Sequence, residues 1–203
     1  FFEDLDPEIE SGVRKAVALM EQNGARVVEV PMPWASMGRA INMRVVMPEA
    51  VAVHEKWIQE RPQDYSPEVR ARLMADIATP AIDYVRYVRA QRARRWFCEQ
   101  MAAAMRGVDV LVTPTVPTQT PTIEACTPPP GQHEGREGQR LAIFTGVFNT
   151  TGQPSLSVPC GFTKDGMPIG VMITGKPFDE VNVLRVGGAY ESLTDWHTRH
   201  PVV

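Results

Sequence analysis

The stretch from Phe144 to Gly161 reads FTGVFNTTGQPSLSVPCG and contains the change of periodicity that decides the fold. Its first part places Phe144 and Phe148 four residues apart, which predicts a helix over residues 137–149. The Gly-Gln-Pro that follows ends this helix, because glycine terminates helices and proline cannot continue one. Polar and apolar residues then alternate over residues 155–160, as in a strand with one buried face.

Downstream of this stretch the sequence predicts a hairpin and a closing helix. Residues 164–166 read Lys-Asp-Gly, and an Asp-Gly pair between two apolar runs is a strong hairpin signal. The second strand of the hairpin is expected over residues 169–174, and a helix over about residues 179–193. The side chains expected on the core face of that helix are Val181, Leu184 and Tyr190.

Upstream, residues 108–112 read VDVLV, which is typical of a strand buried on both faces of a sheet. We expect this strand to be central in the sheet. A proline-rich loop over residues 113–132 follows, because its many prolines prevent a regular ladder. The expected helices further upstream cover residues 7–20, residues 35–60 with a kink or break at Pro48, and residues 66–106, which are split into two helices at Thr79-Pro80.

A short β-branched strand is expected over residues 25–30 (ARVVEV), between the first two helices. The order of elements therefore predicts an α/β fold with a mixed β-sheet flanked by helices. No Gly/Ser-rich linker divides the sequence, so we expect one domain.

Composition excludes several classes of protein. The chain has 203 residues, 43% of them apolar, and a formal net charge of -3, which gives no electrostatic case for nucleic acid or membrane surfaces. Three cysteines without a CxxC pair favour a reducing, cytoplasmic setting. No apolar run reaches the roughly 18 residues of a membrane span. The sequence opens at Phe1 without Met or a signal peptide, so we expect residues to precede it.

Familiar catalytic motifs are missing from the sequence. It contains no GxSxG, GxxxxGK[ST], GxGxxG or HExxH pattern. His197 and His200 are interpreted as surface residues, and we expect no metal and no cofactor. Ser155 and Ser157 could serve as nucleophiles beside a base, but no adjacent base is evident, and structural serines are the favoured interpretation. A basic run contains Arg86, Arg89, Arg92, Arg94 and Arg95. We interpret it as a solvated helix edge and keep RNA contact as the alternative.

Three segments together resemble the amidase-signature enzymes. Residues 109–117 (DVLVTPTVP) resemble their D-x-L-L-x-P-T-x-P segment. Residues 144–161 are similar to F-T-x-x-x-N-x-x-G-x-P-x-x-S-V-P-x-G, and residues 165–180 to D-G-x-P-x-G-x-x-x-x-G-x-x-F-x-E. Their order and spacing match across essentially the whole chain.

The resemblance implies that residues 1–203 form the C-terminal portion of a single amidase-signature domain. Such enzymes hydrolyse a carboxamide to a carboxylate and ammonia through an acyl-enzyme, with a Ser, cis-Ser and Lys triad. The chain has no Gly-Ser step and four scattered lysines, so no catalytic residue can be carried over. The implied partners are the missing N-terminal half and a small-molecule amide substrate. A non-catalytic interaction module, or an amidotransferase fragment that contacts tRNA, is the alternative.

Four residues are the candidates for substrate binding: Arg72, Thr113, Pro114 and Thr115. The last three follow a strand, and ligands of open α/β sheets gather at the carboxyl ends of strands, although a rigid turn explains them equally well. Arg72 lies where the resemblance to the glutaminase branch places an arginine for a substrate carboxylate, although a surface salt bridge is the interpretation that the sequence alone favours. Ala142 stands where that branch has an acidic residue. This departure favours a general amidase over the glutaminase of a tRNA amidotransferase.

Overall fold

The computed structural model of the chain describes residues 1–78, 84–127 and 136–200. Its first element, helix α1 (Pro7–Gln22), begins where Asp6 accepts hydrogen bonds from the backbone N–H groups of Glu8 and Ile9, at 2.8 and 3.3 Å. An acidic N-cap satisfies amides that have no partner within the helix, so the predicted helix start is confirmed. Its apolar side packs on the sheet, with Ile9 and Val13 almost fully buried.

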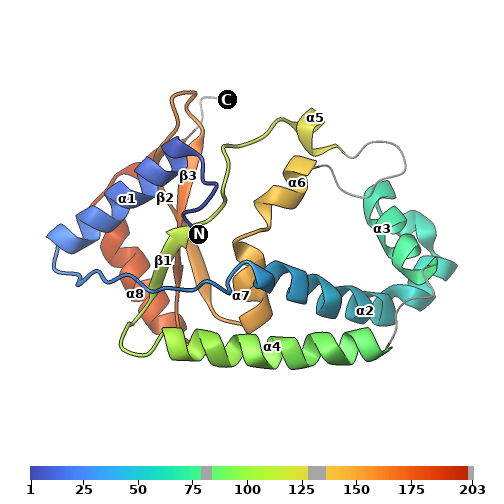
Figure 1. The fold of residues 1–203 in the computed structure, drawn as a ribbon. Coiled ribbons are helices and arrows are strands. Elements are labelled where there is room, and N and C mark those ends of the chain that lie inside the picture. The colour runs from blue at the N-terminus through green and yellow to red at the C-terminus, as the bar shows by residue number, and fades with distance from the viewer. Residues whose placement is uncertain (79–83, 128–135, 201–203) are drawn as a thin grey trace.

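Helices dominate the middle of the chain. Helix α2 (Met37–Glu60) continues through Pro48, and a short 3-10 turn (Pro62–Asp64) leads into α3 (Pro67–Ala78). Helix α4 (Tyr84–Ala104) then packs along α2, as Figure 1 shows. The predicted helices are confirmed, but α2 has no break at Pro48. The expected split at Thr79-Pro80 lies outside the described residues.

Three strands form the described sheet: β1 (Leu111–Pro114), β2 (Ser155–Phe162) and β3 (Pro168–Thr174). Their order is β1-β3-β2, and both pairings are antiparallel. The predicted hairpin is confirmed, with Gly166 in its turn at φ 78°. The central position expected for residues 108–112 is wrong for the described sheet. Strand β3 is central instead, and its Val171 and Ile173 are fully buried.

The loop after β1 contains less irregular structure than its prolines suggest. Thr113 and Pro114 belong to β1, and a short helix α5 (Ile123–Cys126) follows. Residues 128–132 of the expected loop lie outside the described residues.

The helix expected over residues 137–149 is divided into α6 (Arg136–Leu141) and α7 (Thr145–Thr151). A tight turn separates them, in which the N–H of Ile143 donates to the carbonyl of Arg140. This break sets α7 against α2. Phe144 and Phe148 both pack on Phe1 there, with ring centroids 5.1 and 5.6 Å away.

The last helix, α8 (Glu180–Glu191), covers the sheet beside α1. Its core face consists of Val183, Gly187 and Tyr190. The expected core positions Val181 and Leu184 are wrong, since they are 66% and 62% exposed. A 3-10 turn (Trp196–Thr198) follows α8.

Two apolar clusters fill the two sides of the sheet. One joins α1 and α8 to the sheet, and the other joins the opposite side of the sheet to α2, α4 and α7. Figure 1 shows the first group close to the strands, whereas α3 stands far from them at the end of α2. The α/β class predicted from the sequence is confirmed.

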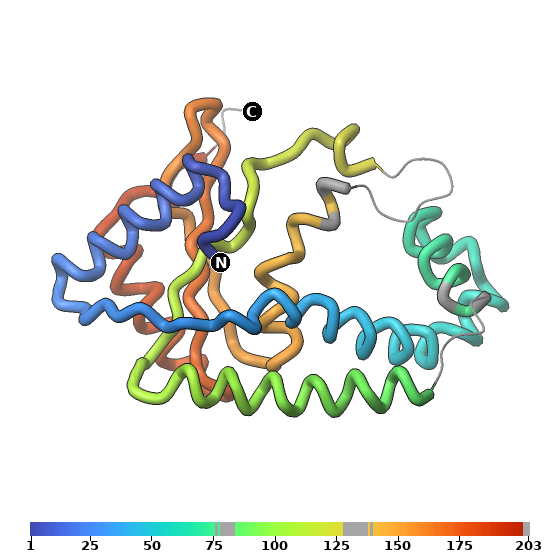
Figure 2. The backbone as a smooth tube through the Cα atoms, viewed as in Figure 1, coloured from blue at the N-terminus to red at the C-terminus, as the bar shows by residue number. Residues whose placement is uncertain are grey.

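The strand expected over residues 25–30 is wrong for the described chain. These residues are extended but have no ladder partner among the described residues. In Figure 2 they link α1 to α2 by passing over β1. The described residues also contain no helix that is long and apolar enough to cross a membrane.

Candidate functional site

The predicted residues at the end of β1 are positioned by β3. Thr113 pairs with Met172 and Pro114 with Val171, and the Thr115 N–H donates to the Gly170 carbonyl at 3.1 Å. Thr113 is 3% exposed, Pro114 is fully buried and Thr115 is half-buried. Of the three predicted residues, Thr115 is therefore the one whose side chain reaches the surface.

Two hydroxyl groups meet above the central strand. The side-chain oxygens of Thr115 and Ser157 are 2.6 Å apart, and either can donate the hydrogen bond. Gly170 lies beneath them, where a Cβ atom would be 2.8 Å from Thr115 Oγ1 and 2.9 Å from Ser157 Oγ. Because this glycine has no side chain, side chains from β2 and from the end of β1 can touch across β3. We call Thr115, Ser157 and Gly170 the hydroxyl notch.

Among the residues that the structure describes, no base is hydrogen-bonded to a serine of the notch or of the neighbouring position 155. Ser157 bonds to Thr115, and Ser155 Oγ lies 2.8 Å from Thr174 Oγ1 on the neighbouring strand. No hydrogen bond among the described residues joins either serine to a histidine, lysine or carboxylate. The structural interpretation of the two serines is thus the one that this geometry favours.

Thr113 has an unusual environment for a hydroxyl group. Its Oγ1 is buried and has no hydrogen-bond partner within the described residues. A buried hydroxyl without a partner costs about 1–3 kcal/mol. Thr113 and Thr115 are two residues apart at the end of β1, so both side chains project to the same face of the sheet.

Arg72 lies in another part of the molecule. It belongs to α3, is half-buried, and its Nη2 is 3.7 Å from Met43 Sδ on α2. Figure 1 shows α3 at the opposite end of the molecule from β1. The described chain therefore does not bring Arg72 together with Thr113, Pro114 and Thr115.

The arginine run on α4 has partners within the chain. Arg94 Nε donates to the Thr150 carbonyl at 2.8 Å, and Arg95 pairs with Glu99 at 3.1 Å. These contacts fit the interpretation of a helix edge that packs against α7 and solvent.

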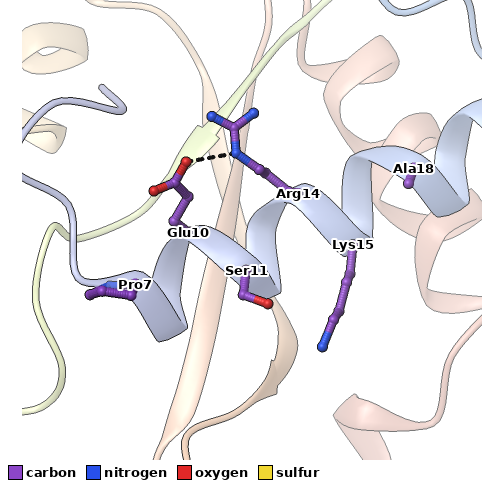
Figure 3. A pocket seen from close by; sticks show the side chains of 6 residues that line it. All are labelled: Pro7, Glu10, Ser11, Arg14, Lys15 and Ala18. Carbon is purple, nitrogen blue, oxygen red and sulfur yellow. Dashed lines mark hydrogen bonds and ion pairs between the residues drawn. The ribbon is translucent and has the colours of Figure 1, made fainter.

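Two of the hollows on the described surface lie beside α1. Figure 3 shows the first, whose six lining residues all belong to the exposed side of α1, with the Glu10–Arg14 ion pair among them. Because the six residues lie on one face of a single helix, their side chains do not converge on a common point as those of a binding site do. The second, about 270 Å³, lies between α1, β2 and the end of α8 and is lined in part by Cys160, Tyr190 and Trp196.

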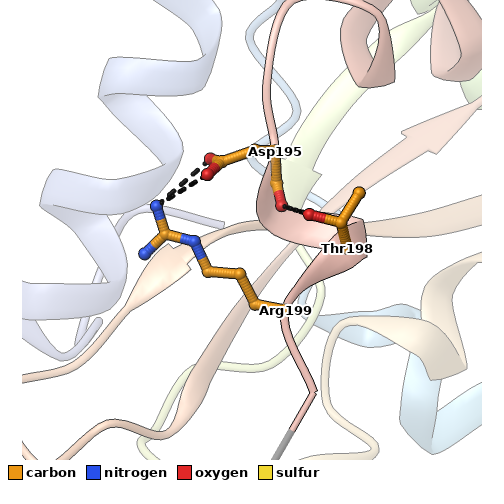
Figure 4. Close-up of polar contacts among 3 residues, drawn as sticks. All are labelled: Asp195, Thr198 and Arg199. Carbon is orange, nitrogen blue, oxygen red and sulfur yellow. Dashed lines mark hydrogen bonds and ion pairs between the residues drawn. The ribbon is translucent and has the colours of Figure 1, made fainter.

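Two side chains that line the second hollow, the thiol of Cys160 and the phenol of Tyr190, have raised pKa values. Burial raises the pKa of Cys160 to about 12, and mainly burial also raises the pKa of Tyr190 to about 12. The thiol and the phenol therefore stay protonated. The turn beside the hollow is held by Arg199, which bonds to Asp195 at 3.0 Å and lies 4.3 Å above the Trp196 ring; Figure 4 shows the ion pair.

Sequence reasoning missed the hydroxyl notch as a unit. Thr115 was predicted and Ser157 was weighed as a nucleophile, but their contact depends on the order of the strands. Gly170, in the segment PIGVMIT, carries the available signal, since a glycine inside a strand indicates close approach by other groups.

Comparisons with known proteins agree on one family. The family model Amidase matches residues 1–184. An amidase of Pseudomonas putida is 39% identical over 208 residues, which cover 99% of this chain and 42% of that protein. A glutamyl-tRNA(Gln) amidotransferase subunit of Chloroflexus aggregans is 34% identical over 226 residues, with 99% and 44% covered.

Comparison with solved structures indicates the same family. A crystal structure of an amidase superposes with a TM-score of 0.78 at 27% identity, covering 94% of this chain and 43% of the other. The chain thus spans less than half the length of the relatives that it matches. Since the family model covers nearly the whole chain, the chain belongs to the amidase family.

Proposed function

We propose that this chain is the C-terminal portion of an amidase-signature amidohydrolase. The whole enzyme converts a carboxamide to a carboxylate and ammonia through an acyl-enzyme. The observation that carries the proposal is the match of almost the entire chain to less than half of an amidase. The rest of the domain supplies the Ser, cis-Ser and Lys triad.

The chemistry of the described residues supports this division of labour. Ser155 and Ser157 are each bonded to a threonine, and the chain has no Gly-Ser step. Of its four lysines, Lys56 lies 3.9 Å from Glu60 on α2, and Lys164 is in the hairpin turn. This portion therefore contributes sheet and pocket wall. The wall residues that we propose are Thr113, Pro114 and Thr115.

The proposed substrate is a small neutral amide rather than glutamine. Glutamine would need a carboxylate for its amine and a cation for its own carboxylate. Ala142, in the turn between α6 and α7, has no charge to offer an amine. The second candidate function, the glutaminase of a tRNA amidotransferase, is supported by the Chloroflexus relative and by Arg72 as a carboxylate ligand. We favour the general amidase.

A chimera tests the proposal. This chain replaces the matched segment of the Pseudomonas putida amidase, and ammonia release is measured with simple carboxamides. We expect the chimera to turn over amides that the parent hydrolyses, because the triad and the pocket wall are then both present. The purified 203-residue chain and the remainder of the parent, each alone, should release no ammonia above background.

Two results would overturn the proposal. The first is turnover by the isolated chain that disappears in Ser155→Ala or Ser157→Ala. The second is a chimera that folds as cooperatively as its parent but hydrolyses none of the parent's amides.

A further inference from the structure

The start of α1 holds the chain that leaves β1. The Asp6 N–H donates to the Pro117 carbonyl at 3.0 Å. The side-chain amide of Gln119 donates to Asp6 Oδ2 at 3.2 Å and to Glu8 Oε1 at 3.4 Å. Figure 2 shows the chain after β1 running beside the start of α1. Gln119 is 113 and 111 positions away from the two acids in the sequence, so the tertiary fold brings these groups together.

Glu8 makes a second connection, to the hairpin. Its Oε2 accepts a hydrogen bond from the Lys164 N–H at 2.8 Å, while its Oε1 accepts from Gln119. One carboxylate therefore joins the first turn of α1, the chain after β1 and the turn between β2 and β3. Hydrogen bonds to an ionised acceptor are about twice as strong as bonds between neutral groups. We call Asp6, Glu8 and Gln119 the carboxylate–amide bridge.

The bridge limits the freedom of Thr115. The Thr115 N–H donates to the Gly170 carbonyl, and four residues later Gln119 is bonded to both carboxylates of the bridge. Three residues lie between these two attachments, and one of them is Pro117, whose ring fixes φ. The position of the Thr115 hydroxyl beside Ser157 is therefore set from both ends of a short segment.

Two buried hydroxyl groups indicate that this segment is not arranged for stability alone. Oγ1 of Thr113 and Oγ1 of Thr118 are buried without a hydrogen-bond partner among the described residues. Buried polar groups are normally bonded, and departures from this rule are expected where function requires a particular geometry. Thr113 and Thr118 lie on either side of Thr115 in the sequence.

We propose that Glu8 and Gln119 are positioning residues for substrate binding. The bridge holds Thr115 in the pocket wall without touching the substrate itself. This inference rests on the proposed function, in which Thr115 belongs to that wall. A displaced wall weakens the contacts of the substrate and of the transition state alike, so loss of the bridge raises KM and leaves kcat unchanged.

Alanine variants of the chimera described above test this role. Glu8→Ala and Gln119→Ala should each raise KM for a simple carboxamide about 3- to 10-fold, with kcat within about twofold of the parent chimera. Glu10→Ala is the matched control, because Glu10 is an acid of the same helical turn that pairs with Arg14 instead. It should leave both constants unchanged.

A carboxyl group at position 119 makes the bridge sensitive to pH. The charged groups that bond to Gln119 are Asp6 and Glu8, and the hairpin adds the N–H of Lys164, whose charged side chain is exposed. In Gln119→Glu three carboxylates meet, and like charges disfavour the ionised form. The KM of this variant relative to the parent chimera should be raised at about pH 8 and fall towards 1 at about pH 5, where the introduced carboxyl is protonated and can donate.

Hydrogen exchange of the Thr115 amide reports the position of the wall without catalysis. This amide is bonded to Gly170 and should be protected in the parent chimera. In Glu8→Ala and Gln119→Ala it should exchange at least about fivefold faster, while the amides of β3 keep their rates. Mass spectrometry with fragmentation to single residues measures the exchange.

The outcomes separate this inference from the proposed function. An unchanged KM in the Gln119→Ala chimera overturns the inference, and so does a Thr115 amide whose exchange does not respond. Equal increases of KM in Glu8→Ala and Glu10→Ala assign the effect to α1 as a whole and overturn it too. A folded chimera that hydrolyses no amide overturns the proposed function, and exchange of the Thr115 amide then decides by itself whether the bridge holds this residue.

Discussion

Cys160 is a residue whose chemistry is set by its surroundings. It sits on β2 between α1 and α8, 5% exposed, in the apolar cluster of that side of the sheet. Burial in apolar surroundings disfavours the thiolate and raises the thiol pKa. Since thiolates are the reactive form, this cysteine is chemically silent in the folded chain.

The elevated pKa predicts alkaline destabilisation. The thiol ionises near pH 9.0 when unfolded and near 12 when folded. Its contribution to the free energy of unfolding is therefore fully present below pH 9 and lost as pH rises from 9 to 12. Urea titrations at pH 8 to 11 should show this loss with a slope approaching about 1.4 kcal/mol per pH unit.

A control variant isolates the thiol. Cys160→Ala should remove the part of this pH dependence that comes from the ionisation of the thiol. The part that comes from Tyr190 should remain. If the variant and the parent show the same slope, Cys160 is not the responsible group. At pH 8, a thiol reagent should modify the half-buried Cys98 and Cys126 before Cys160.

At the scale of elements, the crossing of α2 and α7 depends on a glycine. A Cβ atom at Gly38 would lie 2.9 Å from the Val147 Cα and 2.9 Å from a ring carbon of Phe97. The crossing is also held by Thr150, whose hydroxyl donates to the Gly38 carbonyl at 2.7 Å. Backbone cannot move aside as a side chain can, so the close approach requires glycine.

Gly38→Ala should therefore destabilise the chain by about 1–3 kcal/mol, because overpacking outweighs the better helix propensity of alanine. The matched control is Gly188→Ala in α8, where an added Cβ meets nothing within 4 Å. That change should stabilise by about 0.5–1 kcal/mol. Urea unfolding measures both variants, and a neutral Gly38→Ala would contradict the close crossing.

The elements also show how far sequence reasoning reaches. Local signals were sufficient to predict α1 and the β2–β3 hairpin. The Asp6 cap of α1 and the Asp165-Gly166 turn of the hairpin each act within a few residues. The predictions that were wrong concern features that depend on contacts between residues far apart in the sequence. Residues 25–30 have a strand composition, but a strand exists only with a partner. Helix α8 has apolar residues on two faces. Their spacing does not tell which face packs on the sheet, and the prediction selected the exposed face with Val181 and Leu184.

For the candidate site too, local features could be predicted from the sequence and non-local contacts could not. The resemblance and the strand end pointed to Thr113 and Thr115 from the sequence. The contact between Thr115 and Ser157 could not be predicted, because it needs β1 and β2 on opposite sides of β3. The number of residues between Thr115 and Ser157 gives no information on the order of the strands in the sheet.

At the scale of the whole molecule, apolar side chains remain exposed at the start of α8. Phe178 is 94% exposed and adopts a φ of 63°, and Val181 and Leu184 continue the stripe. A left-handed residue with a bulky side chain is uncommon and carries strain. We expect another protein segment to cover these three side chains, because exposed apolar patches mark interaction surfaces.

The stripe predicts a behaviour of the isolated chain. Replacing Val181 and Leu184 by serine should reduce binding of a hydrophobic dye and self-association, with the free energy of unfolding unchanged within about 0.5 kcal/mol. Val183→Ser, in the same helix but 3% exposed, should lower that free energy by at least about 1–3 kcal/mol. Equal destabilisation by both changes would show that the stripe is part of the core.

The order β1-β3-β2 also has a consequence for biosynthesis. Strand β1 leaves the ribosome well before β3, its partner in the described sheet. At about 5–20 residues per second, several seconds pass between the emergence of Leu111–Pro114 and that of Pro168–Thr174, its partner in the described sheet. Pairing of β1 with β3 must therefore follow the emergence of the hairpin.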